Sequence, residues 1–197
     1  LEDQELGTMS ETTLSPAGFL KLLVRQTDAS PALYLLTGES GAGKTTWCLE
    51  LARQAPAVGL LPAGLVSPAV FEVGVKTSID LMDVASGERR RLASWNSQPI
   101  IPDGKPPLHW HFDPAALAWG NQLLAALPPS ELFLLDELGP LEFHHGGGLG
   151  GGLDRLDARL DRAAVVVIRP QLLEAAQARW PWAQVCAPVL TKAEFNQ

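Results

Sequence analysis

The chain has 197 residues, which is more than one average domain and less than two, and 46% of them are hydrophobic, enough to fill a substantial core. No uninterrupted apolar stretch approaches the ~18 to 20 residues that cross a membrane, so we expect a soluble protein without a membrane partner. The net charge of −7 and a single tight basic cluster at residues 89–91 argue against an extended nucleic-acid-binding surface.

The N-terminal part, residues 1–30, is interpreted as a helical extension of a single domain that covers residues 31–197. Its apolar residues gather around positions 19–23, which favours a helix. Met9 followed by Ser10 offers a native start, in which case residues 1–8 are an addition to the natural chain. The two cysteines, Cys48 and Cys186, lack metal-binding spacing, which favours reduced buried thiols in a cytoplasmic protein over a disulfide.

Residues 32–36 are apolar throughout and predict a strand that is buried on both faces of a parallel sheet. Residues 38–46, GESGAGKTT, follow and match the phosphate-binding pattern G-x-x-x-x-G-K-[ST]. In such a loop, glycines turn backbone N–H groups around the β-phosphate, Lys44 reaches the β- and γ-oxygens, and Thr45 offers its hydroxyl to Mg²⁺. The predicted nucleotide-binding residues are Gly38, Glu39, Ser40, Gly41, Ala42, Gly43, Lys44, Thr45 and Thr46.

The pattern predicts that the chain binds a nucleoside triphosphate, ATP or GTP, together with Mg²⁺. A glycine-rich turn that only caps a helix is the alternative. Apolar residues recur at helical spacing after the loop until Pro56 ends the pattern, so the motif has the strand and the helix that it requires on its two sides.

The region from about 68 to 112 predicts antiparallel hairpins inserted into the α/β core. Short β-rich pieces between residues 70 and 92 are separated by turn signals at 76–78 and 85–88. Residues 94–107 are rich in Pro, Asn, Ser and Gly and predict an irregular connection that could cover the site. His109 and His111 would share one face of a strand, but without a third ligand they are interpreted as ordinary histidines rather than a metal pair.

A helix is predicted from Asp113, as its N-cap, to the prolines at 128 and 129. The next apolar run, residues 132–135, is a second buried strand that leads directly into Asp136 and Glu137. We expect Asp136 to bind Mg²⁺ with Thr45, and Glu137 to orient and deprotonate the attacking water. The alternative is that the two acids only end a strand and meet solvent.

The last third of the chain predicts a glycine-rich connection, a helix, a third buried strand and a final helix. Residues 144–152 contain two histidines and a glycine run, expected to be a mobile connector, with a flap that contacts substrate or a partner as the alternative. The helices are expected over 153–161 and 171–179, and the strand over 163–168. Arg169 follows this strand and is a candidate to stabilise the γ-phosphate, although an ordinary surface arginine is at least as well supported.

Strands that alternate with helices predict a three-layer α/β sandwich whose mainly parallel sheet binds its ligand at the carboxyl edge. The segment DELGPLE, residues 136–142, resembles the DEIGPME-type Walker B segment of the small P-loop nucleoside triphosphatases, a family with nucleotide kinase-like members. A strand at 64–67, the stretch 73–93 and the helix entry at Phe112-Asp113 agree in order, so that the resemblance spans about residues 32 to 170.

The resemblance implies the RecA-like branch of P-loop proteins and hydrolysis of several nucleoside triphosphates to diphosphate and phosphate, with a broad base preference. It also implies that Lys44 and Thr45 serve phosphate and magnesium, Asp136 the metal and Glu137 the water.

Two other functions stay open. A phosphotransferase could use the inserted hairpins and the connection at 99–107 to hold an acceptor hydroxyl. A nucleotide-dependent adaptor or switch could hydrolyse slowly to reset its conformation, and the phosphate loop also resembles that of the molybdopterin-guanine-dinucleotide biosynthesis adaptor. The sequence does not identify a protein partner, a base preference or an oligomeric state.

Overall fold

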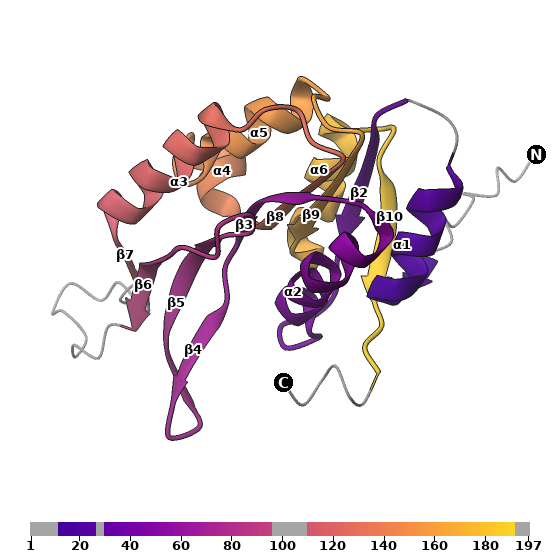
Figure 1. Cartoon of the computed structure of the whole chain (residues 1–197). Coiled ribbons are helices and arrows are strands. Elements are labelled where there is room, and N and C mark those ends of the chain that lie inside the picture. Colours follow the sequence, from indigo (N-terminus) through magenta and orange to yellow (C-terminus); the bar gives the residue numbers. More distant parts are fainter. Residues whose placement is uncertain (1–11, 27–29, 96–109, 192–197) are drawn as a thin grey trace, which may run out of the picture.

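The computed structural model describes residues 12–26, 30–95 and 110–191, and a ten-stranded sheet forms its centre (Figure 1). Six neighbouring strands run parallel, in the spatial order β1 (Thr12–Leu14), β10 (Gln184–Pro188), β2 (Ala32–Leu36), β9 (Ala163–Ile168), β8 (Leu132–Leu138) and β3 (Pro62–Val66). The sheet continues antiparallel through β5 (Val75–Asp83), β6 (Arg89–Trp95) and β7 (Trp110–Phe112), and β4 (Ala69–Glu72) pairs with β5. The predicted mainly parallel α/β fold is confirmed.

Helices cover both faces of the sheet. One face carries α1 (Pro16–Arg25), α2 (Lys44–Gln54) and the 3-10 turn η1 (Ala55–Val58). The other carries α3 (Pro114–Ala126), α4 (Pro140–His145), α5 (Gly150–Asp157), the 3-10 turn η2 (Pro170–Leu172) and α6 (Leu173–Arg179). Successive side chains of β2 alternate between the two cores, because Leu33 and Leu35 pack on the α3 face whereas Tyr34 and Leu36 pack on the α1 face. This alternation is why the central strands are apolar at every position.

The antiparallel strands β4 to β7 lie in the region predicted as inserted hairpins, and Figure 1 shows the β4–β5 hairpin extending away from the helical layers. The turn expected at 76–78 is wrong, since the chain reverses at Val73 and Gly74, with φ of 50° and 78°. The turn expected at 85–88 is confirmed, and the Asp83 carboxylate accepts the N–H groups that open it. Residues 96–107 and His109 lie outside the described residues.

The described part of the N-terminal segment packs on the same core as the rest of the chain. β1 pairs with β10 at the edge of the sheet, and the indole of Trp47 in α2 donates to the Leu14 carbonyl at 2.7 Å. The Phe19 ring in α1 contacts Tyr34 of β2 edge-on, with ring centroids 4.8 Å apart. The predicted helix is confirmed as α1, which Ser15 caps by accepting the Gly18 N–H, whereas β1 had no counterpart in the prediction.

The glycine run after α4 makes specific contacts, in contrast to the mobile connector that we expected. α5 begins within the run at Gly150 and ends at Asp157, not over 153–161. Gly152 lies against β8, where a Cβ would be 2.4 Å from Leu135 Cδ2, so that only glycine allows this approach without a shift. The Glu142 carboxylate accepts the N–H groups of Gly139 and Leu149, both at 2.8 Å, and thereby holds the corner between α4 and α5.

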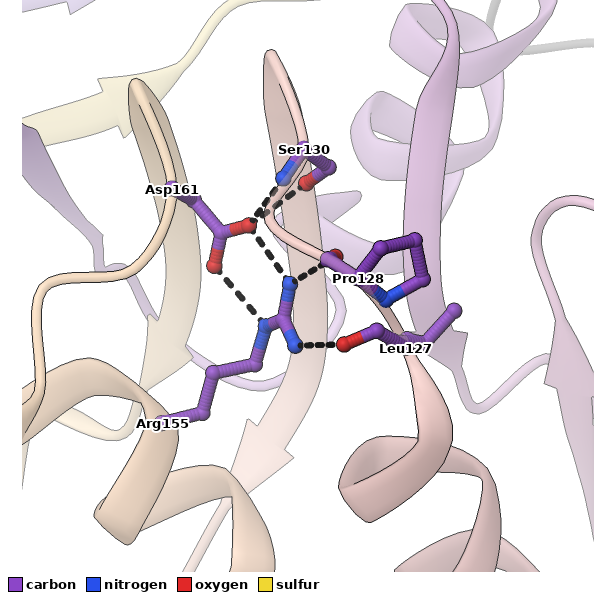
Figure 2. Close-up of polar contacts among 5 residues, drawn as sticks. All are labelled: Leu127, Pro128, Ser130, Arg155 and Asp161. Atoms are coloured by element: carbon purple, nitrogen blue, oxygen red, sulfur yellow. Dashed lines mark hydrogen bonds and ion pairs between the residues drawn. The ribbon is translucent and has the colours of Figure 1, made fainter.

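A buried ion pair closes the amino edge of the sheet (Figure 2). Arg155 donates to both carboxylate oxygens of Asp161, at 2.6 and 2.8 Å, and each side chain is only 3% exposed. The guanidinium also donates to the carbonyls of Leu127 and Pro128, and Asp161 accepts the N–H and the hydroxyl of Ser130. The pair therefore joins the end of α5 to the segments that enter β8 and β9.

The cysteines Cys48 and Cys186 are buried and form no disulfide, as expected. Burial is the main cause that raises the pKa of the Cys48 thiol well above its ordinary value. Within the described ranges, no helix combines the length and apolarity that crossing a bilayer requires.

Candidate nucleotide-binding site

The phosphate-binding pattern forms the turn between β2 and α2, at the carboxyl edge of the parallel strands. Gly41 and Gly43 have φ of 83° and 82°, a backbone region that glycine adopts without strain, and Gly43 is the N-cap of α2. The Lys44 ammonium donates to the carbonyls of Gly38 and Glu39, at 2.6 and 2.8 Å, and so lies against the loop that it belongs to. The first turn of α2 thus places a cation and a helix N-terminus together, an arrangement suited to phosphate.

Asp136 lies at the same edge, near the end of β8, and only 2% of the residue is exposed. Its carboxylate accepts hydrogen bonds from the Thr45 hydroxyl and from the Ser67 N–H, the latter at 3.3 Å. Burial is the main cause that raises its pKa to about 6, and the charge of Glu137 acts in the same direction. The hydrogen bonds from Thr45 and Ser67 and the charge of Lys44 lower the pKa and only partly offset the burial.

Lys44, Thr45 and Asp136 are therefore brought together as the sequence predicted, although Asp136 lies about ninety positions further along the chain. Ser67 is a contact that sequence reasoning missed. It follows β3 at the same edge, and its hydroxyl donates to the Asp136 carbonyl at 2.5 Å. Its signal in the sequence was a polar residue at the end of the strand predicted at 64–67.

Glu137 and Arg169 also meet at this edge. β8 and β9 are neighbours, with Leu138 paired with Ile168, and Arg169 directly follows β9. The Arg169 Nε donates to the Glu137 carboxylate in an ion pair whose side chains are 58% and 28% exposed, respectively. These two candidates are thus accessible to solvent, unlike Asp136.

The three histidines that the structure describes lie outside this cluster. His144 and His145 end α4, with their rings 6.4 Å apart, and His111 lies on β7 at the far edge of the sheet. In the described part of the chain, no group of three or more His, Cys, Asp and Glu side chains is arranged to hold a metal ion. A metal at the phosphate loop would therefore take only part of its ligands from the protein.

The residues present fit Mg²⁺ in this way. The ion prefers oxygen ligands, and it is usually held by one or two protein groups together with substrate phosphates and water. A hydroxyl and a buried carboxylate, from Thr45 and Asp136, already contact each other. A divalent cation beside Asp136 would also offset the desolvation that raises the pKa of its carboxyl.

The fold and this site define a P-loop nucleotide-binding protein, with a glycine-rich loop between a buried strand and a helix and an acidic residue two strands away. A model of the family described as NTPase matches residues 33–146, which is more than half of the chain. The chain therefore belongs to the NTPase family.

Similar proteins include two named nucleoside-triphosphatase THEP1. That of Caldivirga maquilingensis is 32% identical over 110 residues, which cover 56% of this chain and 60% of the relative. That of Thermofilum pendens is 29% identical over 125 residues, which cover 64% of this chain and 68% of the relative. The chain thus spans about three fifths to two thirds of the length of these relatives.

Two solved structures share the fold. A solution structure of a human cancer-related nucleoside triphosphatase superposes with a TM-score of 0.56 at 20% identity, over 85% of this chain and 92% of the other. The crystal structure of THEP1 from the hyperthermophile Aquifex aeolicus gives a TM-score of 0.52 at 15% identity, over 82% and 91%.

Proposed function

We propose that this protein binds a nucleoside triphosphate with Mg²⁺ at the loop of residues 38–46 and hydrolyses it to diphosphate and phosphate. The observation that carries the proposal is the meeting of Lys44, Thr45 and Asp136 at one edge of the sheet, with Glu137 next to Asp136 on the same strand. The names of the similar proteins support hydrolysis, and the family supports a nucleoside triphosphate as the substrate.

In the proposed reaction the loop N–H groups and Lys44 bind the phosphates, and Thr45 and Asp136 hold the metal. Mg²⁺, when bound, neutralises charge on the β- and γ-phosphate oxygens. Glu137 orients a water molecule in line with the γ-phosphorus and accepts its proton, while Arg169 contacts the γ-phosphate. The bond between the γ-phosphorus and its bridging oxygen breaks, and the diphosphate leaves.

We propose that the base preference is broad, with ATP and GTP both accepted. The loop, Lys44 and the acids would all act on the triphosphate and the metal, which every nucleotide shares. The experiment that tests the function is phosphate release by the purified chain from ATP, GTP, CTP and UTP, with Mg²⁺ and with a chelator. Adding nucleosides, nucleotides or sugars then reveals any phosphotransferase, because label would move into a new product.

Variants test the roles of the residues. Glu137→Gln should lower kcat by about 10²- to 10⁴-fold while nucleotide affinity stays within a few-fold, because the acid acts on water rather than on the phosphates. Lys44→Ala should weaken both binding and turnover. Glu131→Gln is a matched control, an exposed acid just before the opposite end of β8, and should change neither. Hydrolysis at the wild-type rate by the Glu137 variant would discard this mechanism.

A further inference from the structure

Arg169 lies between the phosphate loop and the acid that would orient the water. The strand order β2, β9, β8 places β9 between the strand that enters the phosphate loop and the strand that carries Glu137. β9 pairs with both neighbours up to its last residues, with Val167 opposite Leu36 and Ile168 opposite Leu138. Arg169 is therefore the first residue beyond the strand that separates the two halves of the site.

The ion pair of Arg169 uses one edge of its guanidinium. The contact runs from Nε to Glu137 Oε1, and more than half of the arginine side chain is exposed. A guanidinium is planar and carries several N–H donors in a fixed fork, so that it can bind a carboxylate on one edge and a phosphate on another. A lysine ammonium at this position would supply the charge without that geometry.

We propose that Arg169 is a positioning residue that links Glu137 to the γ-phosphate. Its Nε holds the Glu137 carboxylate, and its terminal nitrogens bind the γ-phosphate oxygens, so that the acid is aligned on the water only when a triphosphate is present. This inference rests on the proposed function and adds how the same site distinguishes a triphosphate from a diphosphate. The proton of the attacking water passes to a Glu137 oxygen, and Arg169 keeps its charge throughout.

The proposal predicts that removal of Arg169 affects the diphosphate and the triphosphate differently. The β-phosphate would be held by Lys44 and the loop, so removal of Arg169 should leave the affinity for a diphosphate unchanged. The same change should weaken binding of a triphosphate and remove the alignment of Glu137. An arginine that only stabilises the fold would instead affect both ligands alike, or neither.

The first measurement is calorimetric titration, with Mg²⁺, of a nucleoside diphosphate and of its non-hydrolysable β,γ-imido triphosphate analogue. We expect Arg169→Ala to lower the triphosphate-to-diphosphate affinity ratio by about tenfold or more, as the loss of a charge-assisted contact predicts. Arg169→Lys should recover part of this ratio but little turnover. An unchanged ratio in Arg169→Ala would overturn the inference.

The second measurement is a double-mutant cycle on kcat. Arg169→Ala should lower kcat by about 10- to 10³-fold, because the Glu137 carboxylate would no longer be aligned on the water. If Arg169 acts through Glu137, the Glu137→Gln/Arg169→Ala double variant should be no more than about twofold slower than Glu137→Gln alone. Losses that multiply would overturn the inference.

Arg179→Ala is the matched control, since Arg179 forms an exposed pair with Asp157 between α6 and α5. It should change neither the affinity ratio nor kcat. The two proposals fail separately. Absence of phosphate release by the wild-type chain would overturn the proposed function, whereas loss of turnover in Glu137→Gln with full turnover in Arg169→Ala would overturn only the role of Arg169.

Discussion

Each of the two edges of the parallel sheet carries a buried carboxylate, but only the carboxylate at the amino edge is paired with a buried cation. At the amino edge, Asp161 is met by the Arg155 guanidinium and by two donors of Ser130, so that its charge is matched by a buried cation (Figure 2). At the carboxyl edge, Asp136 is equally buried, and its pKa is raised to about 6 because its neighbours only partly offset the loss of solvent. The protein alone balances the charge of Asp161 at the amino edge, whereas at the carboxyl edge we propose that a cation from outside would balance the charge of Asp136.

This difference separates a structural cluster from a binding site. A buried ion pair with complete hydrogen bonding adds little net stability, but it costs a great deal when one partner is removed. A buried carboxylate without a matching cation lowers the stability of the empty protein and becomes favourable when a metal binds. Burial alone therefore does not identify the functional end, whereas the balance of charge does.

The largest effect on stability should come from Arg155→Ala. The change leaves the Asp161 carboxylate buried without its cation, and it also removes donors from the carbonyls of Leu127 and Pro128. We expect the free energy of unfolding to fall by about 3 to 5 kcal/mol in urea titrations. Arg169→Ala is the control at the other edge, where the pair is largely exposed, and should cost less than about 1 kcal/mol. Equal losses of stability in the two variants would show that the pair at the amino edge contributes no more to the fold than the exposed pair at the carboxyl edge.

Asp136→Asn should have the opposite sign and a smaller size. The folded-state pKa of about 6 lies above the unfolded value of ~3.9, so the bound proton stabilises the fold below the unfolded value, and this contribution is lost as the pH rises through about 6. At pH 8, without metal or nucleotide, the asparagine variant should be more stable than the wild type by about 1 to 3 kcal/mol.

Urea titrations between pH 5 and pH 8 with a chelator measure this difference, which should shrink towards pH 5. With Mg²⁺ and a non-hydrolysable triphosphate analogue the order should reverse, because the ligand would stabilise the wild type more. A difference that does not vary with pH would show that the burial of Asp136 is not the cause.

Gly148→Ala should have the smallest effect of the three changes. It tests a third carboxylate, that of Glu142. Glu142 is buried close to the carboxyl edge, yet backbone N–H groups satisfy it. Gly148 has a φ of 64°, and a Cβ there would lie 1.8 Å from Glu142 Oε1. We expect a loss of about 1 to 2 kcal/mol by thermal or urea unfolding.

Gly150→Ala is the matched control in the same glycine run, because a Cβ at this position meets nothing within 4 Å. It should be neutral or stabilise α5 by up to about 1 kcal/mol, since alanine favours a helix more than glycine does. A loss equal to that of Gly148→Ala would mean that the whole run, rather than the contact with Glu142, requires glycine.

Local sequence patterns predicted the strands that are covered on both faces and the helix whose cap is formed by residues close in the chain. The strands at residues 32–36 and 163–168 agree with β2 and β9 to the residue, because a strand covered on both faces has to be apolar throughout. The helix that Asp113 caps was found because a cap depends on neighbours a few residues away, and the Asp113 carboxylate accepts the Ala115 N–H.

The errors fall where tertiary contacts override local preference. The turn at Val73 and Gly74 places a β-branched residue at positive φ, which turn statistics disfavour. α5 starts among glycines, which are poor helix formers, and one of them, Gly152, lies too close to Leu135 for a Cβ to fit without a shift. β1 has three residues, too few for a period to emerge, and pairing with β10 defines it.

By itself, the sequence determined the phosphate loop, the buried strands and the acids that follow one of them, because each depends on residues close together in the chain. Only the tertiary structure decided that Ser67 reaches Asp136 and that Arg169 stands beside Glu137. The reason is the order of the strands across the sheet, which brings distant segments to one edge, and no spacing along the chain encodes that order.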